Sequence, residues 1–156
     1  MTEPVYSQFC ADETALRDVA ATLANCVGHQ AIILLQGPLG AGKTTFARGF
    51  MQGLGYTGHV KSPTYSIVEP YEFLDYQLFH FDFYRISDPE ELEFIGLHDY
   101  VAQNSICLFE WPELAGHLLP PADILCQFTI TATGRQLTIS ALSSRGKQIL
   151  NLLTHA

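Results

Sequence analysis

Basic side chains are scarce in this sequence. Its 156 residues contain eight Lys and Arg against sixteen Asp and Glu, which gives a formal net charge of −8 at pH 7. A protein that bound nucleic acid by itself would need clustered Lys and Arg to displace the counterions around the phosphates. The few basic residues here are spread along the chain. We therefore expect any RNA involved to be held by another subunit.

Disulfide, metal and membrane patterns are also missing. The four cysteines form no Cys-x-x-Cys pair and the six histidines form no His-Glu-x-x-His string. We therefore expect reduced, mostly buried thiols and surface or structural histidines. The chain shows no secretory signal, and no apolar run approaches the length of a membrane span. These absences predict a cytoplasmic protein with no membrane attachment.

The composition suits one folded domain. A hydrophobic share of 47% and a charged share of 15% are typical of a globular protein with a real core. No internal repeat, low-complexity tract or linker divides the chain. We expect residues 1–156 to form a single domain.

The clearest positive signal is the string Gly37–Thr44, which has the P-loop spacing of Gly, four residues and Gly-Lys-Thr. Glycines permit left-handed and close-approach backbone conformations, so successive N–H groups can point at phosphate oxygens. Lys43 can then reach the β- and γ-phosphates, and the Thr44 hydroxyl can ligate Mg²⁺. The residues predicted to bind nucleotide in this segment are Gly37, Leu39, Gly40, Ala41, Gly42, Lys43, Thr44 and Thr45.

The surrounding segments fit a strand, a loop and a helix. Residues 31–35 are an unbroken apolar run, typical of a strand buried on both faces. After the loop, apolar residues recur at helical spacing from Phe46 to Leu54. Gly53 and Gly55 mark the end of that helix.

Further elements follow from periodicity and turn residues. Residues 124–130 and 137–141 alternate on either side of a glycine turn, which predicts an antiparallel hairpin. We expect an α/β, three-layer P-loop NTPase-like domain with a mixed sheet that includes this hairpin. The remaining predictions are helices at 12–28, 88–96 and 143–153, and strands at 65–71, 77–85 and 106–109.

Glu110 is the expected metal anchor. A P-loop needs a second metal ligand, and α/β sheets carry their ligands at the carboxyl ends of strands. Four apolar residues run directly into Glu110, so Thr44 and Glu110 are the predicted metal ligands. Whether Glu110 contacts Mg²⁺ directly or through water is open. The alternative is a solvated acid that ends a strand.

Asp82 and Thr64 are the expected catalytic residues beside Lys43. Aromatic and polar positions alternate around Asp82, so its charge lies opposite an aromatic face and needs water, a metal or a base to satisfy it. We predict that Asp82 holds Mg²⁺ or orients the attacking water. The alternative is a solvent-facing side chain paired with Arg85 or Lys61. The Ser-Pro-Thr turn at Thr64 either brings a hydroxyl to the γ-phosphate or the metal and reports nucleotide state, as switch loops do, or is a plain turn.

Two further residues have more than one interpretation. Trp111, the only tryptophan, directly follows the expected metal anchor and is a site reporter, a partner anchor or a core residue. Arg135 lies just after the hairpin turn and is included among the nucleotide-binding residues, since it could approach the base or a phosphate. An ordinary surface position is the alternative for Arg135.

Three functions are compatible with a phosphate site of this kind. An ATP-hydrolysing accessory subunit is favoured, because a metal anchor is present without evident machinery for an acceptor substrate. A small-molecule kinase usually needs several arginines to clamp its acceptor, and the five arginines do not cluster. A GTP-dependent switch protein would need an Asn-Lys-x-Asp string to read guanine, which the sequence lacks.

Six strings in one order make the chain similar to the TsaE family, the P-loop ATPase component of bacterial tRNA threonylcarbamoyladenosine synthesis. The similarity covers nearly the whole length, with looser agreement at the Gly134-Arg135 turn and in the carboxyl-terminal helix. The strings are Gly37–Phe46, Lys61–Tyr65, Val68–Tyr71, His80–Arg85, Asp88–Glu93 and Glu110–Pro112.

The resemblance implies a small cytoplasmic Mg-dependent ATPase with weak activity of its own, stimulated by a complex of two other proteins, TsaB and TsaD. It also implies that ATP binding or hydrolysis resets that complex between rounds of modifying the adenosine next to the anticodon, so tRNA is reached only indirectly. In family terms, Lys43 and Thr44 serve phosphate and Mg²⁺, and Glu110 serves Mg²⁺. Asp82 and Thr64 lie at the catalytic and switch side.

Overall fold

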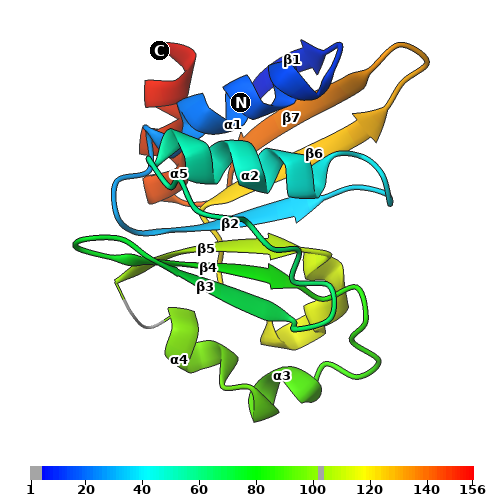
Figure 1. Cartoon of the computed structure of the whole chain (residues 1–156), viewed down its shortest axis with the longest axis vertical. Helices are drawn as coiled ribbons and strands as arrows, with labels where there is room; N and C mark the ends of the chain where they lie inside the picture. The colour runs from blue at the N-terminus through cyan, green and yellow to red at the C-terminus, as the bar shows by residue number, and fades with distance from the viewer. Residues whose placement is uncertain (1–4, 102–103) are drawn as a thin grey trace.

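In the part of the chain that the structure describes, seven strands form one mixed sheet at the centre of the protein (Figure 1), in the order β1-β7-β6-β2-β5-β4-β3. The computed structural model describes residues 5–101 and 104–156. Strands β6, β2, β5 and β4 are parallel neighbours, and antiparallel strands β1, β7 and β3 complete the two edges. The strands are β1 (Val5–Cys10), β2 (Ala31–Gln36), β3 (Val68–Glu72), β4 (Gln77–Asp82), β5 (Ser105–Glu110), β6 (Ile124–Ile130) and β7 (Arg135–Ala141).

Helices cover both faces of this sheet and bury two hydrophobic clusters against it. The helices of the first cluster are α1 (Glu13–Ala24), α2 (Lys43–Gly53) and α5 (Ser144–Thr154). Those of the second are α3 (Glu91–Phe94), α4 (Leu97–Val101) and the 3-10 helix η1 (Pro112–Leu118). Figure 1 shows α1, α2 and α5 grouped together, apart from α3 and α4. The predicted three-layer α/β architecture, with a mixed sheet and the β6–β7 hairpin, is confirmed.

Two strands are shorter than predicted, for local reasons. β3 begins at Val68 instead of residue 65, because Ile67 has a φ of 71° and its N–H donates to the Pro63 carbonyl in a turn. β4 ends at Asp82 instead of residue 85, because the Asp82 carboxylate accepts the Tyr84 N–H at 2.9 Å and the chain turns away. The predicted strands at 65–71 and 77–85 are corrected accordingly.

The predicted helix at 88–96 is wrong in part. Within this range only α3 is helical, and Gly96, whose φ of 75° lies where the sequence predicted an end, separates it from α4. Asp88 caps a turn before α3, since its carboxylate accepts the Glu90 N–H at 3.0 Å. Strand β1, helix α4 and helix η1 were not predicted. Most of β1 is exposed, so it has no buried face that would produce a clear hydrophobic alternation.

The cysteine prediction is confirmed, because Cys10, Cys26, Cys107 and Cys126 are free and buried. No helix within residues 5–101 and 104–156 is long and apolar enough to cross a membrane.

Parallel pairing brings three strand ends to one edge of the sheet. Glu110, the last residue of β5, lies opposite Leu35 of β2 and opposite Asp82 of β4. The glycine-rich segment Gly37–Thr44 leaves the same edge directly after β2 and leads into α2. The carboxyl edge of an α/β sheet is where such folds bind their ligands.

Close packing of α1 against α2 depends on glycine at position 49. A Cβ there would lie 2.6 Å from the Arg17 Cα and 2.7 Å from the Arg17 carbonyl oxygen. Gly49→Ala should therefore destabilise the fold by about 1–3 kcal/mol through overpacking, although alanine favours an isolated helix. Thermal unfolding should show a melting temperature lower by about 2–4 °C for each kcal/mol.

The control for this prediction is Gln52→Ala on the exposed face of the same helix, which should leave the melting temperature within about 1 °C. An unchanged or higher melting temperature for Gly49→Ala would show that helix propensity outweighs the contact with α1.

Candidate active site

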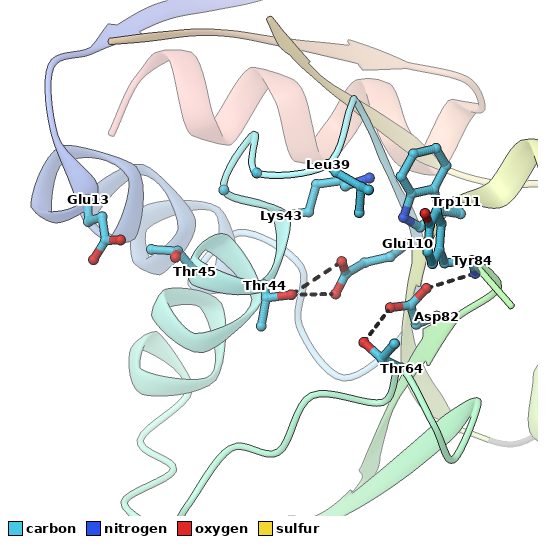
Figure 2. Close-up of a pocket in the computed structure, with 12 residues that line it drawn as sticks. Glu13, Leu39, Lys43, Thr44, Thr45, Thr64, Asp82, Tyr84, Glu110 and Trp111 are labelled. Carbon is cyan, nitrogen blue, oxygen red and sulfur yellow. Dashed lines mark hydrogen bonds between the residues drawn. The ribbon is translucent and has the colours of Figure 1, made fainter. Parts of the chain in front are cut away.

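A pocket of about 370 Å³ opens at the carboxyl edge of the sheet (Figure 2). It brings together the end of β5, the end of β4 and the first turn of α2. The residues that line it are Glu13, Leu39, Gly40, Gly42, Lys43, Thr44, Thr45, Thr64, Asp82, Tyr84, Glu110 and Trp111. Most of the residues predicted from the sequence therefore meet in one cavity.

The Gly37–Thr44 loop has the conformation that an anion-binding loop requires. Gly40 and Gly42 have φ values of 76° and 103°, in the region that only glycine occupies freely. Asp12 and Ser143 cap α1 and α5 with side-chain oxygens, whereas α2 has Gly42 at this position and no side-chain cap. The first N–H groups of α2 thus have no side-chain acceptor, which suits an anion at the helix N-terminus.

Lys43 lies inside the pocket at 5% exposure. Its ammonium group donates to the Gly37 carbonyl and lies 3.6 Å from the centroid of the Trp111 ring. Trp111 adopts a left-handed backbone conformation with φ of 58° immediately after β5. Burial lowers the pKa of Lys43, while the carboxylates of Glu110, Glu113 and Asp82 act in the opposite direction. Trp111 is thus part of the site.

Glu110 and Thr44, the two predicted metal ligands, are in contact. The Thr44 hydroxyl lies 3.3 Å from each carboxylate oxygen of Glu110, which is only 3% exposed. No group of three or more His, Cys, Asp or Glu side chains that could hold a metal occurs in the described part of the chain. One carboxylate and one hydroxyl fit Mg²⁺, which usually takes one or two carboxylates together with substrate phosphates. The residues present therefore fit this ion better than a metal that needs an all-protein site.

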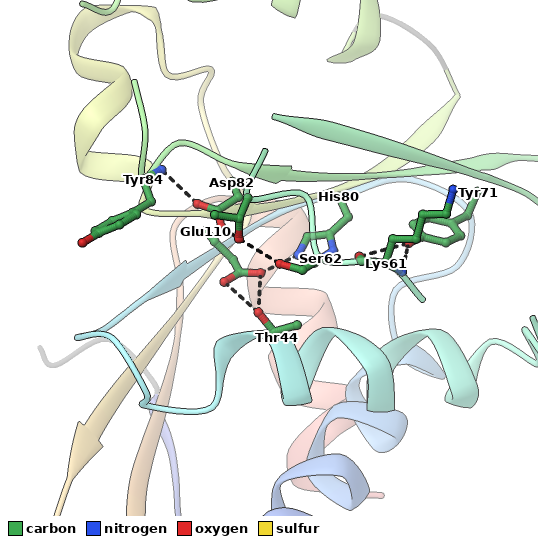
Figure 3. Close-up of polar contacts among 9 residues, drawn as sticks. Thr44, Lys61, Ser62, Tyr71, His80, Asp82, Tyr84 and Glu110 are labelled. Carbon is green, nitrogen blue, oxygen red and sulfur yellow. Dashed lines mark hydrogen bonds and ion pairs between the residues drawn. The ribbon is translucent and has the colours of Figure 1, made fainter. Parts of the chain in front are cut away.

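A buried histidine holds Glu110 from the other side (Figure 3). The Nε2 atom of His80 lies 2.6 Å from Oε2 of Glu110, and His80 is fully buried. The sequence grouped His80 with surface or structural histidines and gave it no role in the site. Its position on the same strand face as Asp82, two residues away, was the available signal.

Asp82 is buried, not solvent-facing, at 6% exposure. Its carboxylate accepts hydrogen bonds from the Tyr84 N–H at 2.9 Å and from the Thr64 hydroxyl at 3.2 Å (Figure 2). Burial raises the pKa of Asp82 and the Glu110 carboxylate adds to the rise, while the two hydrogen bonds oppose it. The alternative pairing with Arg85 is not seen, because that guanidinium lies over the Tyr65 ring at 4.3 Å.

The Ser-Pro-Thr turn reaches the site through Thr64. The Ser62 hydroxyl lies 2.8 Å from that of Thr64, so the two form a chain of hydrogen bonds that ends on Asp82. Thr64 lines the pocket, whereas Ser62 is exposed. The turn therefore links the solvent side of the protein to the buried Asp82 carboxylate.

Arg135 and two loop residues lie outside the main pocket. The Arg135 guanidinium donates to the Gly40 carbonyl at 3.0 Å and lines a smaller cavity of about 190 Å³ beside Ala41. Gly37 takes part through its carbonyl, which accepts from Lys43. Glu13 lines both cavities from the first turn of α1, and no motif in the sequence indicated it.

The parallel centre of the sheet, the glycine loop leading into α2 and the two carboxylates at the same edge define an α/β domain of the P-loop NTPase-like type. The chain belongs to the TsaE family, since the family model described as "Threonylcarbamoyl adenosine biosynthesis protein TsaE" matches residues 10–138. Membership connects the chain with threonylcarbamoyladenosine biosynthesis. The family prediction is confirmed.

Individual relatives agree with this assignment. The chain is similar to the tRNA threonylcarbamoyladenosine biosynthesis protein TsaE of Haemophilus influenzae, with 46% identity over 124 residues, or 80% of this chain and 78% of that protein. The Bacillus subtilis TsaE protein is 38% identical over 126 residues, or 79% and 77% of the two chains. The crystal structure of YdiB from Bacillus subtilis matches with a TM-score of 0.85 and 26% identity, covering 99% of this chain and 97% of that one.

Burial of the Asp82 carboxylate predicts a stability effect with a definite sign. A carboxyl whose pKa is raised by folding destabilises the folded state once it ionises. Asp82→Asn should therefore melt at the same temperature as the wild type at neutral pH, or about 1–4 °C higher. The difference should begin to shrink once the pH falls below the raised folded-state pKa, and it should vanish below the ordinary Asp pKa of about 3.9, where both states are protonated. A lower melting temperature at neutral pH would contradict this account.

Proposed function

We propose that the chain is a cytoplasmic, Mg-dependent ATPase that acts as an accessory subunit in tRNA threonylcarbamoyladenosine biosynthesis. It hydrolyses ATP slowly by itself and is stimulated by a complex of TsaB and TsaD. The observation that carries the proposal is the convergence of Lys43, Thr44, Asp82 and Glu110 on one pocket at the N-terminus of α2. Family membership supplies the pathway.

We assign phosphate binding to the glycine loop and to Lys43. The uncapped N–H groups at the start of α2 suit the oxygens of a polyphosphate. The Lys43 ammonium group lies in the same pocket and would exchange its contact with the Gly37 carbonyl for a phosphate oxygen. We propose that Arg135, whose guanidinium donates to the Gly40 carbonyl, contacts the base or a phosphate of the nucleotide.

We assign the metal to Thr44 and Glu110, whose side chains already touch. Mg²⁺ at this position would neutralise charge on the β- and γ-phosphates. The task of the two side chains is to hold the ion at the carboxyl edge of the sheet. This leaves Asp82, the other buried carboxylate in the pocket, to accept a hydrogen bond from the attacking water. Thr64 orients Asp82 by donating to its carboxylate.

Low intrinsic activity and dependence on a partner are consistent with the scarcity of basic side chains in the pocket. Among the described residues that line it, Lys43 is the only basic one, and no arginine contributes. An arginine supplied by a second protein raises phosphoryl-transfer rates by about 10³–10⁵ in other nucleotide hydrolases. The same lack of arginine gives no support to a kinase that must clamp an acceptor. The net charge of −8 suits a subunit that reaches tRNA only through its protein partners.

Removal of the Lys43 ammonium group should abolish tight binding of Mg-ATP. We expect Lys43→Ala to weaken binding by about 100-fold or more, or roughly 2.7 kcal/mol, in isothermal titration calorimetry. Lys61→Ala is the control, because Lys61 is exposed and outside the pocket, and it should bind as the wild type does. Retained affinity in Lys43→Ala would refute the phosphate assignment.

Partner stimulation tests the proposed function most broadly. We expect ATP turnover by the isolated protein to be slow and to rise at least about tenfold when TsaB and TsaD are added. Asp82→Asn should fold and bind Mg-ATP but lose about 10²–10⁴ of the stimulated turnover. Asp75→Asn, at an exposed position, serves as the control. Fast turnover without partners that does not respond to them would contradict the accessory role.

A further inference from the structure

We propose that His80 is a positioning residue that fixes the Glu110 carboxylate for metal binding. The inference rests on the proposed role of Glu110 as the metal anchor and adds a residue on which that anchor depends. It is carried by a short contact between two fully desolvated side chains, one on β4 and one on β5.

Strand register explains how the two side chains meet. Across the β4–β5 pair, His80 is opposite Leu108 and Asp82 is opposite Glu110. Glu110 therefore reaches His80 diagonally, back along the strand, and does not point straight out of the sheet edge. Their side chains are only 1% and 4% exposed, and 2.6 Å separates Nε2 from Oε2. A carboxylate held this way has little freedom to choose another rotamer.

The surroundings of the two ring nitrogens of His80 determine how its imidazole ring is oriented. The Glu110 carboxylate acts as the acceptor, so Nε2 of His80 carries the hydrogen of this bond. Nδ1 is buried and has no partner among the described residues, which suits a bare lone pair better than an N–H group. Turning the ring over would present a carbon atom to Glu110 and break the contact. Only one arrangement of His80 thus serves the carboxylate.

Because of this contact, the two oxygens of the Glu110 carboxylate have different partners. Oε2 is bound by His80 and approached by Thr44, whereas Oε1 has only the Thr44 hydroxyl as a partner among residues 5–101 and 104–156. Oε1 is accordingly the oxygen left for a metal on the Thr44 side. His80 does not line the pocket, and its side chain is only 1% exposed. It cannot touch the substrate, so its effect must pass through Glu110.

Losing a residue that orients a metal ligand typically costs 10–100-fold in metal affinity. The experiment measures the dissociation constant of a non-hydrolysable ATP analogue in EDTA and in excess Mg²⁺. The Mg²⁺ factor is the value in EDTA divided by the value in Mg²⁺. His80→Phe keeps a ring but has no donor, and we expect it to lower this factor by about 10–100-fold. Affinity in EDTA should not change, because the phosphate contacts of Lys43 and the glycine loop are intact.

The matched control is His80→Gln, whose amide nitrogen can occupy the position of Nε2 and donate to Glu110. We expect this variant to keep the Mg²⁺ factor within about threefold of the wild type, as a donor restored in the right place should. His80→Asn has the same chemistry but its amide is too short to reach, so it should behave as His80→Phe. If the Phe variant does not fold, as judged by thermal unfolding, the Gln and Asn pair decides the question.

Glu110→Gln separates this proposal from the proposed function. If Glu110→Gln lowers the Mg²⁺ factor while His80→Phe and His80→Asn leave it at the wild-type value, the role of His80 is overturned and the metal anchor stands. Equal losses in His80→Gln and His80→Asn would also overturn it, since the donor would not matter. If Glu110→Gln keeps the wild-type factor, both the metal assignment and the His80 proposal fail.

Discussion

A carboxylate inside a protein is unfavourable unless hydrogen bonds satisfy it, and the site depends on how Glu110 meets this condition. The residue ends β5 at 3% exposure, with the Thr44 hydroxyl of α2 on one side and the His80 imidazole of β4 on the other. These groups meet because β2, β5 and β4 are parallel neighbours whose carboxyl ends coincide. The order of the strands thus determines the chemistry that the pocket can perform.

Features with a local cause could be predicted from the sequence. The spacing of Gly37–Thr44 indicated a left-handed loop before a helix, and Gly40, Gly42 and α2 have that geometry. The apolar run before Glu110 indicated an acid at a strand tip, and the acid is there. Alternation around Asp82 put the carboxylate on the face opposite the aromatic residues, which pack in the second hydrophobic cluster. Each of these signals spans only a few residues and depends little on tertiary packing.

The rest depends on strand pairing between distant segments and on tight turns that oppose local propensity. His80 and Glu110 are 30 positions apart, and nothing local to either residue shows that β4 and β5 are neighbours. Ile67 has a positive φ value that its side chain disfavours, so the pattern predicted a strand where the chain turns. No sequence feature indicated the positive φ of Trp111. Asp82 ends its strand early because its own carboxylate binds the Tyr84 N–H. Strand pairing and tight turns thus overrode local propensity at the edge of the sheet where the pocket lies.

The central claim is that Thr44 and Glu110 together hold the metal of a nucleotide site. A crystal structure with Mn²⁺ and a non-hydrolysable ATP analogue tests it most directly, because the anomalous signal of manganese locates the ion independently of the phosphates. The account predicts one manganese peak between the Thr44 hydroxyl and the Glu110 carboxylate, bound to Glu110 directly or through one water, with the triphosphate along the Gly37–Thr44 loop. A manganese peak away from both side chains, or an analogue bound outside this pocket, would contradict it.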